Sequence, residues 1–129
     1  MLKAGNTLYM PIGEIYRKPH LWALLCDPIK GEDKVLIVNI NTMRKNADST
    51  CTLNVGDHPF IRHESFVNYA NSALVSVEKL EDSLSTGRAE YREALKEKVL
   101  KRIRQCLLVS PHTPFDVRNI WLKIMKNYD

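Results

Sequence analysis

The apolar residues of this chain change their spacing near residue 77, and this change limits the fold more than any other feature. Before it, they form short runs rich in β-branched side chains, the strongest being Lys34–Thr42 (KVLIVNINT). After it, they recur every four positions, as in amphipathic helices. Strands followed by helices are typical of an α+β protein. We therefore predict a single domain over 1–129, with a small, strongly bent antiparallel β-barrel over 1–77 and a mainly helical part over 78–129.

Turn-forming residues divide the first half into short strands. The first two apolar runs are Leu8–Met10 and His20–Asp27 (HLWALLCD). Proline, glycine and aspartate between the second run and Lys34–Thr42 predict a hairpin loop of about five residues. After a dense cluster of turn residues, Ser65–Tyr69 and Ala73–Val77 are predicted as two further short strands.

The second half is predicted to contain helices. A short one is expected over Val77–Leu84. Glu90–Val109 carries an apolar residue at every fourth position and basic residues on the other side, which predicts one long amphipathic helix. The last helix is expected to begin at Thr113, whose hydroxyl would cap it, with Pro114 in its first position.

Positive charge is concentrated in the last third of the chain. The chain has 19 Lys and Arg against 15 Asp and Glu, a formal net charge of +4. Residues 88–129 alone hold ten basic and five acidic residues. A basic surface can bind nucleic acid or an acidic partner, although basic helix faces are often simply solvated. The candidate residues for such a surface are Lys98, Lys101, Arg102 and Arg104.

Cysteine usage and hydropathy indicate the compartment. The three cysteines, Cys26, Cys51 and Cys106, are odd in number and widely spaced, which is typical of a reducing environment. No run approaches the roughly 18 apolar residues that a membrane span needs. The first six residues have no apolar run of the signal-peptide kind. We therefore expect a cytoplasmic protein that does not contact a membrane.

The segment Gly56–Ser65 (GDHPFIRHES) is the densest cluster of reactive side chains. Two histidines beside an arginine suit metal-free phosphodiester cleavage. One imidazole takes the proton of a ribose 2′-hydroxyl and another protonates the leaving oxygen, while arginine stabilises the charge on the phosphate. The alternative is structural, with Asp57 and His58 fixing the turn and His63 paired to Glu64 or to a backbone carbonyl.

The same segment also has histidine spacing that permits zinc binding. His58 and His63 could act with Cys51 and Asp57. A structural zinc site normally shows ligands in closely spaced pairs, and no second cysteine lies near Cys51. We therefore expect no metal and no other cofactor.

Three segments, in order, resemble a known family. They are Gly5-Asn6-Thr7-Leu8-Tyr9, Pro19-His20-Leu21-Trp22-Ala23-Leu24-Leu25 and Val35–Thr42. This arrangement, over roughly residues 4–77, is similar to the MazF/PemK growth-inhibitor toxins of bacterial toxin–antitoxin systems. The resemblance implies an SH3-like barrel with helices, a homodimer, an antitoxin-like protein partner and metal-independent cutting of single-stranded RNA.

The resemblance carries over to individual residues only in part. Thr42 matches the family's threonine or serine that ends the third strand and helps the transferred phosphate, whereas Lys18 stands where the family has an arginine before its proline. We predict as catalytic residues His20, Thr42, Arg62 and His63. We predict as RNA-binding residues Lys18, Arg44, His58 and Ser65. The alternatives are a non-catalytic barrel module that binds protein or nucleic acid, and an interaction domain that serves a separate enzyme.

Overall fold

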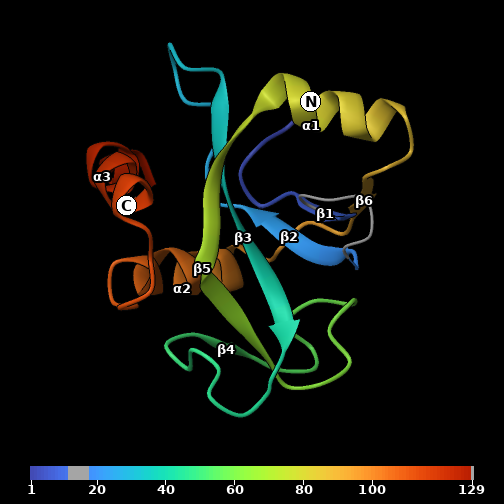
Figure 1. The fold of residues 1–129 in the computed structure, drawn as a ribbon, viewed down its shortest axis with the longest axis vertical. Coiled ribbons are helices and arrows are strands. Elements are labelled where there is room, and N and C mark those ends of the chain that lie inside the picture. Colours follow the sequence, from blue (N-terminus) through green and yellow to red (C-terminus); the bar gives the residue numbers. More distant parts are fainter. Residues whose placement is uncertain (12–17, 129) are drawn as a thin grey trace.

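The computed structural model describes residues 1–11 and 18–128, and its centre is a six-stranded antiparallel sheet (Figure 1). The strands are β1 (Thr7–Met10), β2 (His20–Leu24), β3 (Lys34–Thr42), β4 (Thr52–Leu53), β5 (Ser65–Ser76) and β6 (Glu90–Arg92). The helices are α1 (Val77–Ser85), α2 (Glu97–Leu107), α3 (Phe115–Ile124) and the 3-10 helix η1 (Met125–Tyr128). The sheet order is β4-β5-β3-β2-β1-β6.

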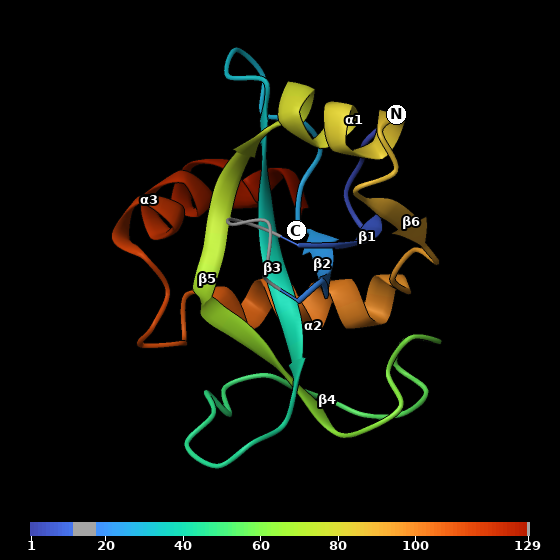
Figure 2. The ribbon, with the colours of Figure 1, turned by 45° about the vertical axis from the view of Figure 1, so that its right-hand side comes forward.

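The sheet bends most sharply where β3 pairs with β5. Asn39 pairs with Asn68, but Ile37 pairs with Ala73, so the register shifts over a few residues. The extra residues of β5 form a bulge, in which the Ser72 hydroxyl donates to the Tyr69 carbonyl at 2.6 Å. The two short strands predicted around Asn71 are therefore one long strand, visibly bent in Figure 2. The predicted fold class, a strongly bent antiparallel sheet followed by helices, is confirmed.

Helix α2 lies across one face of the sheet (Figures 1 and 2). It buries an apolar stripe in the common core, and the Tyr69 hydroxyl of β5 donates to the Ile103 carbonyl at 2.7 Å. The residues of this stripe are Val99, Leu100, Ile103 and Leu107. Burying each such side chain contributes about 1.5–3 kcal/mol, so this face fixes the helix on the sheet. Among the described residues, no helix is long and apolar enough to cross a membrane.

The long helix predicted over Glu90–Val109 is wrong in its first part. Glu90–Arg92 is strand β6, which pairs with β1, and the helix begins only at Glu97. Pairing with β1 satisfies backbone groups that an open strand edge would leave without partners, and the Leu95 N–H also donates to the Gly5 carbonyl at 2.8 Å. Tyr91, placed by its spacing on the buried stripe, is 47% exposed.

Two smaller predictions also differ from the structure. The loop between β2 and β3 spans residues 25–33, which is longer than the predicted loop of about five residues. Its first residue still pairs with the next strand, because the Leu25 N–H donates to the Leu36 carbonyl at 2.9 Å. Thr113 does not cap α3, whose N-cap position is Pro114 without a side-chain hydrogen bond. Instead the Thr113 hydroxyl donates to the Leu107 carbonyl at 2.6 Å and so joins α2 to α3.

Candidate active site

Two hollows adjoin at the end of β3, and together they form what we call the groove. The first has a volume of about 420 Å³ and the second of about 390 Å³. They share Leu21, Ile40, Thr42 and Phe60. Leu21 of β2 is the register partner of Ile40 of β3, and alternation along β3 places Thr42 on the same face as Ile40. The strands therefore supply an apolar floor with one hydroxyl at its edge.

The second hollow contains His20 and Arg44. His20 begins β2, and Arg44 follows the end of β3, where its guanidinium lies 4.9 Å from the centre of the Phe66 ring. The pKa of His20 is held below its usual value, first by partial burial of the imidazole and second by the positive charge of Arg44. This lowering favours the neutral imidazole, the form that can accept a proton.

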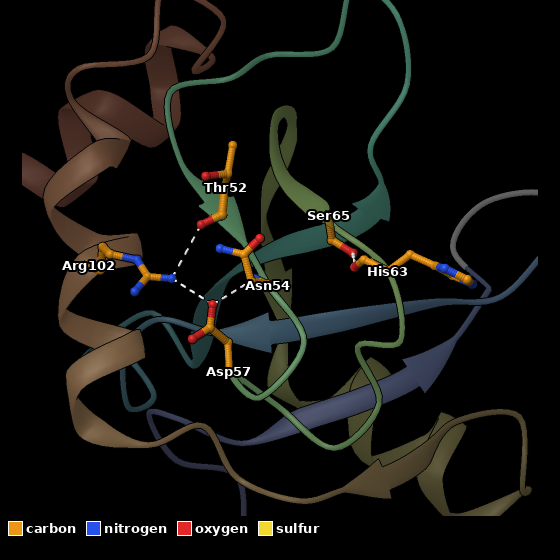
Figure 3. Close-up of polar contacts among 6 residues, drawn as sticks. All are labelled: Thr52, Asn54, Asp57, His63, Ser65 and Arg102. Atoms are coloured by element: carbon orange, nitrogen blue, oxygen red, sulfur yellow. Dashed lines mark hydrogen bonds and ion pairs between the residues drawn. The ribbon is translucent and has the colours of Figure 1, made fainter.

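The first hollow contains Arg62 and His63, both exposed. The backbone that carries them is fixed at two points. The Ser65 hydroxyl donates to the His63 carbonyl at 2.8 Å, and the Met43 N–H donates to the Glu64 carbonyl at 2.9 Å. Figure 3 shows the His63 side chain extending away from the contacts around Asp57. Thus four predicted catalytic residues line one groove, with Thr42 common to both hollows.

His58 lies outside both hollows and is 2% exposed. Its Nδ1 accepts from the Phe60 N–H at 3.0 Å, which assigns the proton of the neutral ring to Nε2. Nε2 donates to the Glu93 carbonyl at 2.6 Å, and the Thr7 hydroxyl donates to the same carbonyl at 2.7 Å. His58 therefore ties the Phe60 turn to the segment after β6, which is the structural alternative considered above.

Asp57, which precedes His58, also makes contacts that stabilise the fold (Figure 3). Its carboxylate accepts from the Asn54 N–H at 2.8 Å and pairs with Arg102 of α2 at 2.9 Å. Partial burial acts to raise the pKa of Asp57, but the hydrogen bond from Asn54 and the contact with Arg102 outweigh it, so the pKa is lowered. Arg102 also donates to the Thr52 carbonyl at 3.3 Å. This contact fastens the turn to helix α2.

The basic surface predicted on α2 is smaller than the sequence indicates. Arg102 pairs with Asp57, and Arg104 is 7% exposed, with its Nε donating to the Leu25 carbonyl at 2.9 Å. Lys98 and Lys101 are exposed. Two of the four predicted cations therefore hold the fold together, which weakens the case for a nucleic-acid surface on this helix.

The remaining predicted binding residues take different positions. Lys18 is exposed and lines neither hollow, although Pro19 beside it does. Ser65 lines the first hollow, but it is 5% exposed and its hydroxyl is bonded to the His63 carbonyl. In the groove, Ser65 therefore holds His63 in place.

Among the residues of the groove that the sequence analysis missed are Phe60, Arg92 and Glu93. Arg92 and Glu93 fell within the predicted long helix, which would have carried them away from the strands. Only the pairing of β6 with β1 brings them to the groove, and no local pattern marks that pairing. Phe60 is a single aromatic residue without a distinguishing spacing.

The arrangement offers few metal ligands. Within residues 1–11 and 18–128, no group of three His, Cys, Asp or Glu side chains is placed to hold a metal ion. Burial raises the pKa of the Cys51 thiol to about 11, so this sulfur stays protonated and is a poor ligand. Both ring nitrogens of His58 already have partners.

Comparison with known proteins identifies a similar fold. One solved structure is titled "Endoribonuclease in complex with its cognate antitoxin from Mycobacterial species". A chain of it matches 89% of this chain over 99% of its own length, with a TM-score of 0.57 and 15% sequence identity. No protein-family model and no curated protein sequence matches this chain. At this level of identity the match establishes a shared fold, an α+β fold with a curled antiparallel sheet and C-terminal helices.

Proposed function

We propose that this protein is a toxin-type endoribonuclease that cuts single-stranded RNA without a metal ion. The observation that carries the proposal is the groove, in which His20 and His63 lie in adjoining hollows that share Thr42. A general base and a general acid must flank one phosphate, and two histidines in adjoining hollows support that assignment. The fold match to a chain of an endoribonuclease–antitoxin complex supports the same class.

The proposed reaction is an attack by the ribose 2′-hydroxyl. Neutral His20 takes the hydroxyl proton as the 2′-oxygen forms a bond to phosphorus. The bond from phosphorus to the 5′-oxygen breaks, and His63, in its imidazolium form, gives its proton to that oxygen. The products are a 2′,3′-cyclic phosphate and a 5′-hydroxyl. Arg62 stabilises the charge that builds on the phosphate, and the Thr42 hydroxyl donates to one of its oxygens.

Arg44 has an indirect part in this reaction. Its charge helps to keep His20 neutral, and it also adds a cation to the wall of the second hollow.

The proposed function also implies protein partners. By the family resemblance, an antitoxin-like protein would bind the chain, and two copies would form a homodimer.

The test is cleavage of a mixed single-stranded RNA pool in the presence of EDTA. We expect the wild type to leave 2′,3′-cyclic phosphate ends, and His63→Ala to lower the rate by about 10²–10⁴-fold. The matched control is His112→Ala, because His112 is exposed and lines neither hollow. No cleavage by the wild type, or equal rates for His63→Ala and His112→Ala, would contradict the proposal. Binding of RNA without products would favour the non-catalytic alternative.

A further inference from the structure

An exposed aromatic cluster stands on the wall that the two hollows share. Phe60 lines both hollows and is 38% exposed. Its ring centre lies 5.0 Å from that of Tyr9, with the ring planes at 49°. The guanidinium carbon of Arg92 lies 5.3 Å from the Tyr9 centre and 5.5 Å from the Phe60 centre. We call Tyr9, Phe60 and Arg92 the aromatic platform.

The platform is held in place by contacts from beneath and beside it. His58 accepts from the Phe60 N–H and donates to the carbonyl of Glu93, the residue that follows Arg92. Tyr9 of β1 is the register partner of Glu90 of β6, and Glu90 also pairs with Arg92 at 3.3 Å. Three segments distant in sequence are therefore fastened together, so a ligand would find the platform already formed.

The charge around the platform favours an anionic ligand. Among the described residues that line the two hollows are three arginines, two histidines and a single acidic residue, Glu93. A polyanion with flat, apolar groups matches both the charge and the aromatic wall. Single-stranded nucleic acid has this chemistry, because unpaired bases stack on aromatic rings and on guanidinium planes.

We propose that the aromatic platform is a nucleobase subsite, on which a base next to the phosphate at Thr42 stacks against Phe60 and Arg92. This inference rests on the proposed function, and it adds how the RNA strand is held. Thr42 lines both hollows together with Phe60, so a phosphate at Thr42 places an adjoining base within reach of the platform. Stacking makes few demands on base identity, so the subsite strengthens binding at many sequences.

The test measures binding to a strand that cannot be cut. A 2′-deoxy oligonucleotide of mixed sequence lacks the attacking hydroxyl, and an abasic strand with the same phosphates lacks the stacking groups. Fluorescence anisotropy gives the dissociation constant of each. We expect Phe60→Leu to weaken binding of the base-containing strand by about 5- to 150-fold and to leave the abasic strand unchanged. The matched control is Phe115→Leu, since Phe115 is 78% exposed on α3 and lines neither hollow.

Two more variants distinguish the loss of stacking from a failure of Phe60→Leu to fold. Phe60→Trp keeps a stacking surface, so we expect affinity close to wild type. Arg92→Lys keeps the positive charge but loses the planar guanidinium on which a base can stack. It should therefore weaken binding of the base-containing strand more than binding of the abasic strand. Equal losses for both strands, or wild-type affinity in Phe60→Leu, would overturn the subsite.

The two proposals fail separately. If the wild type cuts RNA while Phe60→Leu binds the deoxy strand as the wild type does, the nucleobase subsite is wrong and the nuclease stands. If the wild type cuts nothing but Phe60→Leu and Arg92→Lys lose affinity only for the base-containing strand, the subsite stands on a protein that binds without cutting.

Discussion

The two halves of the segment Gly56–Ser65 have opposite roles, although both carry a histidine beside a charged residue. In the first half, His58 is buried and Asp57 is partly buried. Asp57 pairs with Arg102 of α2, and His58 donates to the Glu93 carbonyl, so both are bonded to distant parts of the chain. In the second half, Arg62 and His63 are exposed in the groove. Residue type and spacing therefore do not distinguish the two halves, whereas burial and hydrogen-bond partners do.

Removing each histidine separately tests the difference between the two halves most directly. His58→Ala leaves the Phe60 N–H without its buried partner and should lower the free energy of unfolding by about 1–3 kcal/mol. His63→Ala removes an exposed side chain and should change that free energy by less than about 0.5 kcal/mol. Urea denaturation measures both. Similar losses for the two variants would mean that the halves do not differ as described.

A smaller effect is expected from the Asp57 contact with Arg102. Both side chains are partly exposed, so Asp57→Asn should cost less than about 1 kcal/mol at neutral pH. Because the pKa of Asp57 is lowered in the folded protein, its contribution is present above the unfolded pKa and is lost as pH falls through the folded value. Urea midpoints of the wild type and of Asp57→Asn should therefore converge in acid. A difference that grows in acid would contradict this assignment.

The smallest predicted effect concerns the second hollow. In the proposed reaction His20 acts as the base, so activity is lost when acid protonates its imidazole. Because the pKa of His20 is lowered, activity should extend to lower pH. Arg44→Ala removes one cause of that lowering, so the acidic limb of the profile of kcat/KM against pH should move to higher pH. Lys45→Ala, which changes a neighbouring exposed cation outside both hollows, is the control. A shift in the other direction would exclude His20 as the base.

Local patterns predicted much of the fold. Lys34–Thr42 is a strand with the bounds that its β-branched run indicates, and the stripe of Leu95, Val99, Ile103 and Leu107 is buried as its spacing requires. The same spacing misplaced Tyr91, because a four-residue repeat does not reveal that an earlier strand needs a pairing partner. Sequence patterns report local preference, and strand pairing over a long separation overrides it.

The sequence analysis predicted the reactive side chains that line the groove, but it did not predict Phe60 and Arg92 on the groove wall. Histidine, arginine and threonine are recognisable by chemistry wherever they occur. Phe60, Tyr9 and Arg92 gain their importance only from meeting one another, and the sequence places them in three distant segments. Likewise, His58 is indistinguishable from His63 until its two partners are located.

The bond from His58 to the Glu93 carbonyl has a consequence for the order in which the site can be made. During synthesis, both histidines of the segment and Thr42 leave the ribosome before β6 does. Until Arg92 and Glu93 have emerged and β6 has paired with β1, the Phe60 turn lacks its anchor and the groove lacks one wall. A growing chain therefore carries these side chains for some time without the groove that brings them together, and the groove is completed only as the second half of the protein folds back onto the first.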